Sequence, residues 1–382
     1  MSAKGKDQTF SRLINIQLVL SLLRERPHSG TELADKLVLS NATVSSIIKE
    51  LVDAGVIRVN ETTSVNGLGR KRINYEINPN YGLILAVNIS NFHASVSLID
   101  AKENLIVASD IQVKKYDRQA MYELVLESSK LLIGENKENI KLRCIIITLP
   151  GRVNSQTGEL VLSVQFDKEL FSESHMIQNI FNKQFPDVPV LLANDNNVMS
   201  IGELYNGDLR GVKNGIYFNI DWGIGGGLII DNKLYEGDSG YAGEFGLFKQ
   251  FNGHSFMEID EFISLRALCL KAKEIVGHEV NRDELFELYN NNKKIKEMVL
   301  ESASIVADVL RQMTDILDIS KIVISGRVSN FGNEYISKIQ EGCKSNIRNI
   351  EVKFSSLGNK AVIYGTSYIG LRYMLERLRD KK

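Results

Sequence analysis

Residues 82–382 repeat one pattern twice, and this repeat restricts the fold more than any other feature of the sequence. An apolar segment with the texture of β-strands begins near residue 83, another begins near residue 215, and helical stretches follow each of them. The first of these segments, LILAVNISNFHASVSLID, predicts two strands of an antiparallel pair. Two such halves predict an α/β protein of two lobes, and ligands usually bind in the cleft between lobes.

Further strands are indicated by short apolar runs. They lie at 142–151, 189–195, 215–221, 226–231 and 321–326. The clearest helical stretches are 120–133, 299–317 and 361–379.

The first 80 residues have a different organisation, in which three short helices precede a hairpin. Apolar periodicity predicts helices at 12–25, 30–39 and 40–55, and two strands within 56–79. Pro27 ends the first helix, Ser40 is a suitable N-cap for the third, and Gly55 stops it. This order of elements is that of a winged helix-turn-helix, so we expect a boundary between 1–80 and 81–382.

Two groups of residues in this first segment are candidates for contacting double-stranded DNA. The third helix presents short hydrogen-bonding groups and a lysine near its N-terminus, at Asn41, Thr43, Ser45, Ser46 and Lys49. The hairpin tip GLGRKR places Arg70, Lys71 and Arg72 beside glycines, where the potential of a minor groove attracts cations. The first 80 residues carry 11 Lys/Arg against 8 Asp/Glu. A solvated helix and a charged hairpin are the alternative for each feature alone, but their order favours DNA binding.

Composition limits the other classes of function. The chain is 43% hydrophobic and 24% charged, which is typical of a soluble globular protein. Cys144, Cys269 and Cys343 are scattered and odd in number, so we expect no disulfide framework and a cytoplasmic location. No apolar run approaches the roughly 20 residues that span a bilayer, and no signal peptide is evident, so we expect no membrane partner.

Several motifs, taken in order, resemble the ROK family of repressors, open reading frames and kinases, and in particular its repressor branch. They are GLGRKR, TLPGRVNSQTGELV, LLANDNNVMSIGELYNG, NIDWGIGGGLIIDNKLYEGDSGYAGEFG and IVISGRVS, and the resemblance covers essentially the whole chain. It implies an actin-like and hexokinase-like (ribonuclease H-like) fold, with a smaller lobe at about 81–195 plus the C-terminal helix and a larger lobe at about 196–365. It also implies a sugar in the cleft between the lobes and assembly as a homodimer or a dimer of dimers.

The resemblance further implies which residues contact the sugar. The matching positions are Asn194, Asp195, Glu244, Asp260, Gln165 and Gly151. Asp195 matches the catalytic base of the kinases, which accepts a sugar hydroxyl in the repressors, and a carboxylate is suited to both roles. A helix cap is the alternative for Asn194 and Asp195, because a helical run follows them.

The nucleotide site of the kinases is altered in three places. Asn88 replaces an Asp of the first phosphate motif, and Ser90 replaces one of the paired glycines that follow it. Trp222 stands in place of a Thr in the second phosphate loop, and Arg327 interrupts the adenosine loop. We therefore expect no catalytic residue and no kinase activity.

Two expectations follow for the vacated regions. Trp222 should fill the phosphate pocket and pack between the lobes, while the glycines of 223–227 remain because they turn the chain between two strands. The family's zinc loop is replaced by residues 248–259, which contain no Cys, and Leu247 takes the place of a His ligand. We expect no metal and no cofactor.

Together these features predict a repressor of carbohydrate-utilisation genes that is controlled by a sugar or a sugar derivative. A symmetric dimer should recognise a pseudopalindromic operator. Two alternatives remain open, which are a sugar kinase with a fused DNA-binding domain and a DNA-binding protein that needs no effector.

Overall fold

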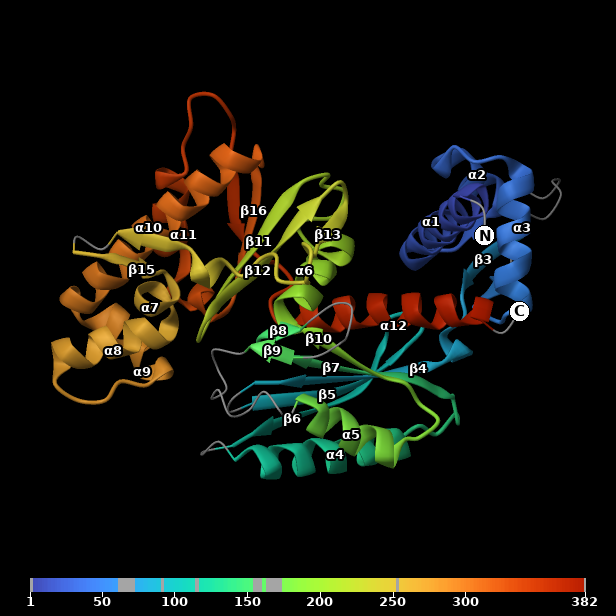
Figure 1. The fold of residues 1–382 in the computed structure, drawn as a ribbon, viewed down its shortest axis with the longest axis horizontal. Helices are drawn as coiled ribbons and strands as arrows, with labels where there is room; N and C mark the ends of the chain where they lie inside the picture. The colour runs from blue at the N-terminus through green and yellow to red at the C-terminus, as the bar shows by residue number, and fades with distance from the viewer. Residues whose placement is uncertain are drawn as a thin grey trace, which may run out of the picture.

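The computed structural model of the chain describes residues 3–60, 73–90, 93–113, 117–153, 160–162, 174–251 and 254–380. Four predicted contact residues, Gln165 and the wing residues Arg70, Lys71 and Arg72, lie outside the described residues. Figure 1 shows the N-terminal helices at one side of the molecule and two sheet-containing lobes beside them.

The N-terminal part of the chain is a winged helix. Its elements are α1 (Ala3–Glu25), β1 (His28–Ser29), α2 (Gly30–Leu37), α3 (Asn41–Asp53), β2 (Ile57–Asn60) and β3 (Asn74–Ile77). The Ser40 hydroxyl caps α3 by accepting the Thr43 N–H at 3.1 Å, and Gly55 adopts a φ of 74° just beyond the helix end. The three helices and the two hairpin strands are confirmed. The sequence did not predict β1, which is two residues long and pairs with β3.

The next elements form the first lobe. They are η1 (Pro79–Tyr81), β4 (Leu83–Ile89), β5 (His93–Asp100), β6 (Leu105–Gln112), α4 (Arg118–Gly134), β7 (Leu142–Leu149), β8 (Arg152–Val153), β9 (Leu160–Leu162), α5 (Ser174–Gln184) and β10 (Val190–Asn194). The last helix of the chain, α12 (Lys360–Asp380), returns to this lobe and lies across the sheet on the side opposite α4 and α5 (Figure 1).

The second lobe follows the same plan with more helices. Its elements are α6 (Asp195–Asn206), β11 (Gly215–Ile220), β12 (Ile224–Ile230), β13 (Lys233–Tyr235), η3 (Phe245–Leu247), β14 (Lys249–Phe251), β15 (Phe256–Glu258), α7 (Asp260–Ile263), α8 (Leu265–Val276), α9 (Arg282–Asn291), α10 (Lys293–Leu317), β16 (Lys321–Ser325), η4 (Arg327–Phe331), α11 (Gly332–Gly342) and β17 (Glu351–Phe354).

The two five-stranded sheets have the same topology, as the sequence repeat predicts. Their strand orders are β10-β7-β4-β5-β6 and β13-β12-β11-β16-β17. In each sheet the first strand is central, pairs antiparallel with the next strand along the chain, and pairs parallel with a later strand. A parallel strand needs a crossover, and the helices that follow each hairpin provide it.

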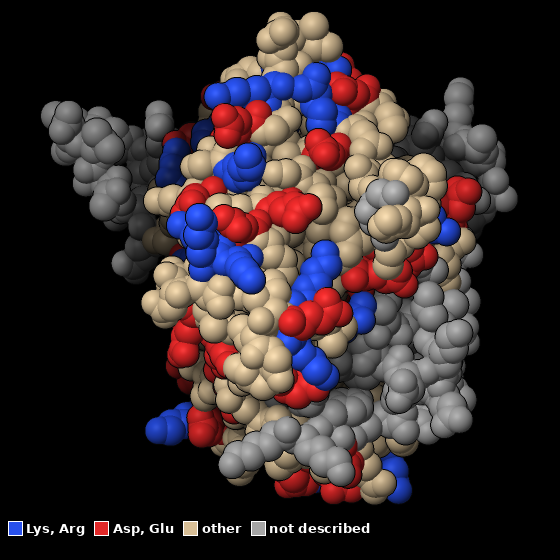
Figure 2. All heavy atoms as spheres, turned by 90° about the vertical axis from the view of Figure 1, so that its left-hand side faces the viewer, with Lys and Arg blue, Asp and Glu red and all other residues tan. Residues whose placement is uncertain are grey.

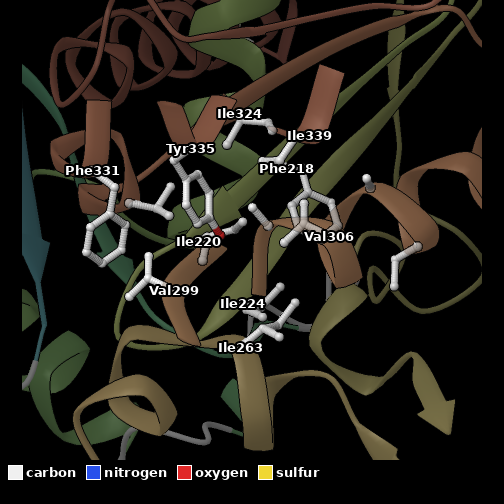
Figure 3. Close-up of a cluster of buried hydrophobic side chains, with 14 of the residues drawn as sticks. Phe218, Ile220, Ile224, Ile263, Val299, Val306, Ile324, Phe331, Tyr335 and Ile339 are labelled. Carbon is white, nitrogen blue, oxygen red and sulfur yellow. The ribbon is translucent and has the colours of Figure 1, made fainter. Parts of the chain in front are cut away.

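Successive side chains of a strand point to opposite faces of the sheet, and both faces of each sheet are buried. In β11, Ile216 and Phe218 face the large core under α10 and α11, whereas Tyr217 faces α6. Figure 3 shows the large core, in which Phe218, Ile324, Tyr335 and other side chains from strands and helices meet. In the first lobe, Ile145 packs towards α4 and α5 while Ile146 packs towards α12. One helix of the pair α6–α12 therefore covers each sheet.

The helices α6 and α12 cross at two glycines, one from each helix. A Cβ atom on Gly202 would lie 2.0 Å from the carbonyl oxygen of Ala361, and one on Gly365 would lie 1.8 Å from that of Val198. Real Cβ atoms essentially never approach a backbone oxygen so closely. The glycines therefore let the two backbones touch, and the pair joins the two lobes as one packed unit.

The winged helix shares an apolar core with the first lobe. Leu20 of α1 and Ile47 of α3 belong to the same buried cluster as Ile84 of β4 and Leu371 of α12. The winged helix is therefore packed against the body of the protein through α12 and β4.

Candidate functional site

The N-terminus of α6 brings together two of the predicted sugar-binding residues. The amide Nδ2 of Asn194 donates to the carbonyl oxygen of Gly151 at 2.7 Å, and its Oδ1 accepts the N–H of Asn197 at 2.8 Å. Asn194 is therefore the N-cap of α6, which is the alternative that the sequence left open. Gly151 lies just beyond β7 with a φ of 124°, a conformation that favours glycine.

Asp195 is the first residue of α6 and lies among other carboxylates. Burial, the largest cause, raises the pKa of its carboxyl from 3.8 to about 7, and the nearby carboxylates of Glu244 and Asp221 also raise it. The N–H of Asn196, which donates to Asp195 Oδ1 at 2.8 Å, lowers the pKa in part. Asp195 and Glu244, which are far apart in sequence, thus lie close enough to interact, and the surroundings of Asp195 are acidic.

Asp260 holds the chain at Ile224, the first residue of β12. Its Oδ1 accepts the N–H of Ile224 at 2.8 Å, and its Oδ2 pairs with Arg266 at 2.8 Å. The Asp260 side chain is 10% exposed. Both oxygens therefore have protein partners already, and the contact of Asp260 with a sugar stays a prediction.

An ion pair closes the end of β11, where the kinases bind phosphates according to the resemblance. The guanidinium Nε of Arg327 lies 2.9 Å from both carboxylate oxygens of Asp221, and the backbone N–H of Arg327 donates to Asp221 Oδ2 at 3.1 Å. The sequence singled out Arg327 but missed Asp221. The signal was an acidic residue ending an otherwise apolar strand, directly before Trp222.

In the described part of the chain Trp222 packs on the second lobe, and its packing between the lobes stays a prediction. Trp222 is half-buried and packs against the large apolar core of the second lobe, whose members are all contributed by that lobe. The Asp221–Arg327 ion pair lies beside it, since the N–H of Trp222 also donates to Asp221 Oδ1 at 2.7 Å. The indole therefore stabilises its own lobe.

The glycines after Trp222 have a steric role that differs from the predicted one. Gly225, Gly226 and Gly227 lie inside β12 and not in a turn. A Cβ atom on Gly225 would lie 2.5 Å from the Asn196 amide, and one on Gly227 would lie 2.3 Å from the Ser200 hydroxyl. The glycines therefore allow α6 to pack closely on β12, and the prediction that they serve a turn is wrong for these three.

Asn88 also has a structural partner. The hydroxyl of Thr148 donates to Asn88 Oδ1 at 2.7 Å, which links the neighbouring strands β4 and β7. The substitution of an amide for a carboxylate at this place removes a negative charge that could hold a metal ion.

The candidate DNA-contacting helix presents its predicted residues to the surface. Asn41, Ser45, Ser46 and Lys49 of α3 are exposed, and Thr43 is half-buried. Two of the five make contacts within the domain, because the Thr43 hydroxyl lies 2.8 Å from that of Ser40 and the Ser46 hydroxyl accepts from Arg12. The opposite face of α3 is buried in the shared core, so the helix is held firmly with its polar side outward.

The outer face of the second lobe is less suited to a polyanion. Figure 2 shows basic and acidic side chains interspersed over the outer face of the second lobe.

Among the described residues, no three His, Cys, Asp or Glu side chains lie together in a way that could hold a metal ion. None of the described helices is both long enough and apolar enough to cross a bilayer.

Comparison with known families assigns both parts of the chain. The model of the ROK family matches residues 84–372, which is most of the chain. The model of the MarR family matches residues 16–64, which include α2 and α3.

Two curated relatives cover nearly the whole chain. The xylose repressor of Caldicellulosiruptor bescii is 23% identical over 391 residues, which span 94% of this chain and 96% of the relative. The DNA-binding transcriptional repressor Mlc of Escherichia coli is 20% identical and covers 90% of this chain and 89% of its own length.

Solved structures agree on the fold. A ROK family transcriptional regulator, a homolog of the E. coli Mlc protein, has a TM-score of 0.77 at 18% identity and covers 95% of this chain and 98% of its own. A ROK family glucokinase from Streptomyces griseus, solved with glucose and AMPPNP, has a TM-score of 0.62 at 18% identity and covers 75% of this chain and 99% of its own. The fold is thus a MarR-like winged helix followed by an actin-like, hexokinase-like domain, and the chain belongs to the ROK family.

Proposed function

We propose that this protein is a transcriptional repressor that a neutral sugar controls and that has no kinase activity. The winged helix binds a pseudopalindromic operator as part of a symmetric dimer. The sugar binds at the N-terminus of α6, between the two sheets, and lowers the affinity for DNA. The named repressors that match nearly the whole chain support this function.

The observation that carries the proposal is the charge of the candidate cleft. Burial raises the pKa of Asp195, and the carboxylates of Glu244 and Asp221 lie close enough to raise it further. Arg327 is already paired with Asp221. Such a site repels a phosphate, whereas the hydroxyl groups of a sugar can donate to carboxylates and replace the lost water. We therefore infer a neutral polyhydroxyl effector rather than a sugar phosphate or a nucleotide.

The relatives suggest which sugar to test first. A relative that spans most of this chain is named a xylose repressor, so D-xylose is the primary candidate, and a structural relative was solved with glucose, so D-glucose is the second. The predicted contacts are Asn194, Asp195, Glu244 and Gly151, with Gln165 and Asp260 as further candidates. For DNA they are the exposed residues of α3 together with Arg70, Lys71 and Arg72.

Calorimetric titration and an operator-binding assay test this function. Titration with D-xylose or D-glucose should give saturable binding, and the same sugar should release an operator fragment. ATP with magnesium should give no binding at millimolar concentration and no sugar phosphorylation, because positioned phosphates and metal ions carry that reaction.

A matched pair of variants separates the cleft from the rest of the lobe. Asp195→Asn keeps the shape but removes the charged acceptor, which contributes about 1.5–3 kcal/mol, so sugar affinity should fall by roughly 10-fold to 150-fold. Asp231→Asn changes an exposed carboxylate of the same lobe and should leave affinity unchanged. ATP turnover by the wild type would establish the kinase alternative, and equal sugar affinity in the two variants would refute the cleft assignment.

A further inference from the structure

The helix α6 runs from the candidate effector site to the boundary with the winged helix. It begins at Asp195, and its last residue, Asn206, donates from Nδ2 to Glu103 Oε2 at 3.0 Å. The preceding residue, Tyr205, stacks on Tyr368 of α12 with ring centroids 3.8 Å apart. The far end of the helix that bears the effector site thus contacts the turn between β5 and β6.

Glu103 lies in that turn and also contacts the winged helix. Its Oε1 is 3.0 Å from Nε of Arg24 on α1, and the two side chains are only 8% and 12% exposed. The Arg24 guanidinium lies over the Tyr368 ring, 4.9 Å from its centroid. One nearly buried carboxylate therefore touches α6 with one oxygen and α1 with the other.

The turn itself is held in place, so Glu103 cannot simply move away. Glu103 has a φ of 69°, which is uncommon outside glycine. The carboxylate of Asp100 accepts the N–H groups of Lys102 and Asn104 at 2.8 and 2.9 Å and fixes the turn. The first lobe thus fixes the position of Glu103, and both α6 and α1 contact this fixed carboxylate.

The contact between these three residues is not fully satisfied in this arrangement. Arg24 Nε, Glu103 Oε1 and Asn206 Oδ1 are buried, and within the described part of the chain none of them has a well-aligned hydrogen-bond partner. Arg24 and Glu103 therefore form an ion pair without an aligned N–H···O bond. Buried polar atoms without hydrogen bonds raise the free energy of the arrangement that contains them. Displacing α6 therefore costs less free energy here than it would in a fully hydrogen-bonded network.

A displacement of α6 cannot be absorbed before it reaches α1. The close crossing at Gly202 and Gly365 leaves α6 and α12 no room to slide independently. α12 in turn packs against α1, where Tyr368 and Leu375 lie beside Leu20. Movement at the effector end of α6 therefore reaches the winged helix both through α12 and through Glu103.

We propose that Arg24, Glu103 and Asn206 form a junction that couples the effector site to the position of α1, with Glu103 as the central positioning residue. The proposal rests on the proposed function, because it takes the N-terminus of α6 as the place where the effector binds. It adds the residues by which occupancy of the cleft changes the presentation of α3 to DNA.

Two variants break the junction, and a third is their control. Glu103→Gln removes the charge facing Arg24, and Asn206→Ala removes the contact from α6 without touching α1. Lys102→Gln is the control, because Lys102 lies in the same turn and pairs with Glu76 of β3 at 2.8 Å, which is also a contact with the winged helix.

The first measurement uses no sugar. Hydrogen exchange of the full chain should show amides of residues 14–25 exchanging about fivefold faster or more in Asn206→Ala, although Asn206 does not belong to the winged helix. Lys102→Gln should instead affect β3. Unchanged exchange of α1 in Asn206→Ala would refute the junction, whatever the effector is.

The second measurement compares operator affinity with and without D-xylose. A coupling of ordinary size changes that affinity by about 5-fold to 150-fold in the wild type and in Lys102→Gln. The ratio should be clearly smaller in Glu103→Gln and Asn206→Ala than in Lys102→Gln, because only the route through α12 remains, while calorimetry should still show D-xylose binding. A full response in both variants would overturn the proposal. A wild type that binds no D-xylose would contradict the choice of sugar, and the exchange measurement would still decide about the junction.

Discussion

Replacing Gly202 by Ala should destabilise the protein even though alanine is the better helix former. The added Cβ would lie 2.0 Å from the carbonyl oxygen of Ala361, 2.8 Å from its carbonyl carbon and 3.0 Å from its Cα. All three are backbone atoms, so α12 as a whole must shift by about 1 Å or more to restore ordinary contact. Overpacking of this kind costs about 1–3 kcal/mol, and the backbone contact places Gly202 at the upper end.

The gain in helix propensity offsets part of that cost. Ala is favoured over Gly by about 1 kcal/mol in a helix interior, so the net loss in the free energy of unfolding should be about 2 kcal/mol. At about 2–4 °C for each kcal/mol in domains of 150–250 residues, the midpoint of thermal unfolding should fall by about 4–8 °C.

Gly134→Ala is the matched control for this experiment. Gly134 is the last residue of α4, and a Cβ there would meet nothing within 4 Å. The control gains propensity without a clash, so its midpoint should stay or rise slightly. Differential scanning calorimetry of both variants decides the matter. Equal midpoints for the two variants would refute the close crossing of α6 and α12.

Three further predictions concern the cleft and the DNA-binding residues. Because the pKa of Asp195 is raised to about 7, the native state holds more protons than the unfolded state between about pH 4 and pH 7. This residue therefore makes the free energy of unfolding fall as pH rises through that range. Urea titrations at several pH values should show a flatter profile of unfolding free energy against pH for Asp195→Asn, and identical profiles would contradict the burial of this carboxyl. Trp222→Thr should cost about 2 kcal/mol, less than the 3–5 kcal/mol of a fully buried aromatic, because Trp222 is half-buried; denaturant unfolding measures it, and no loss would contradict the packing on the second-lobe core. Replacing Arg70, Lys71 and Arg72 together by Ala should weaken binding to operator and random DNA alike, and it should reduce the slope of log affinity against log salt by up to about 2.7. Fluorescence anisotropy at several salt concentrations measures both effects. An unchanged slope would exclude phosphate contacts by the wing.

Much of the fold could be predicted because local patterns agree with it. The winged helix follows from apolar periodicity, from the Ser40 cap and from Gly55, all of which act within a few residues. The duplicated sheet follows from two strand-rich segments at 83 and 215. Short elements such as β1 and β13 were not predicted, because two or three residues are too few to show a hydrophobic periodicity.

The site was predictable only in part, because its contacts join distant residues. Asp195 and Glu244 could be named from motifs, but their proximity depends on how β12, η3 and α6 pack. The pairing of Asp221 with Arg327 spans 106 positions, so the sequence showed Arg327 only as a departure from a motif and did not single out Asp221. The glycines of β12 were explained by a turn, because only the packed structure shows the Asn196 and Ser200 side chains above them.

The ion pair between Asp221 and Arg327 has a consequence for any phosphate that approaches the end of β11. Loss of Arg327 alone would leave an unpaired carboxylate facing any incoming phosphate, which makes the site more repulsive than before. Loss of Asp221 alone would instead release a guanidinium beside the glycine strand, and a free guanidinium attracts phosphate. The two single changes therefore act in opposite directions. A change at Asp221 alone therefore makes this end of β11 more attractive to a phosphate, and a change at Arg327 alone makes it more repulsive.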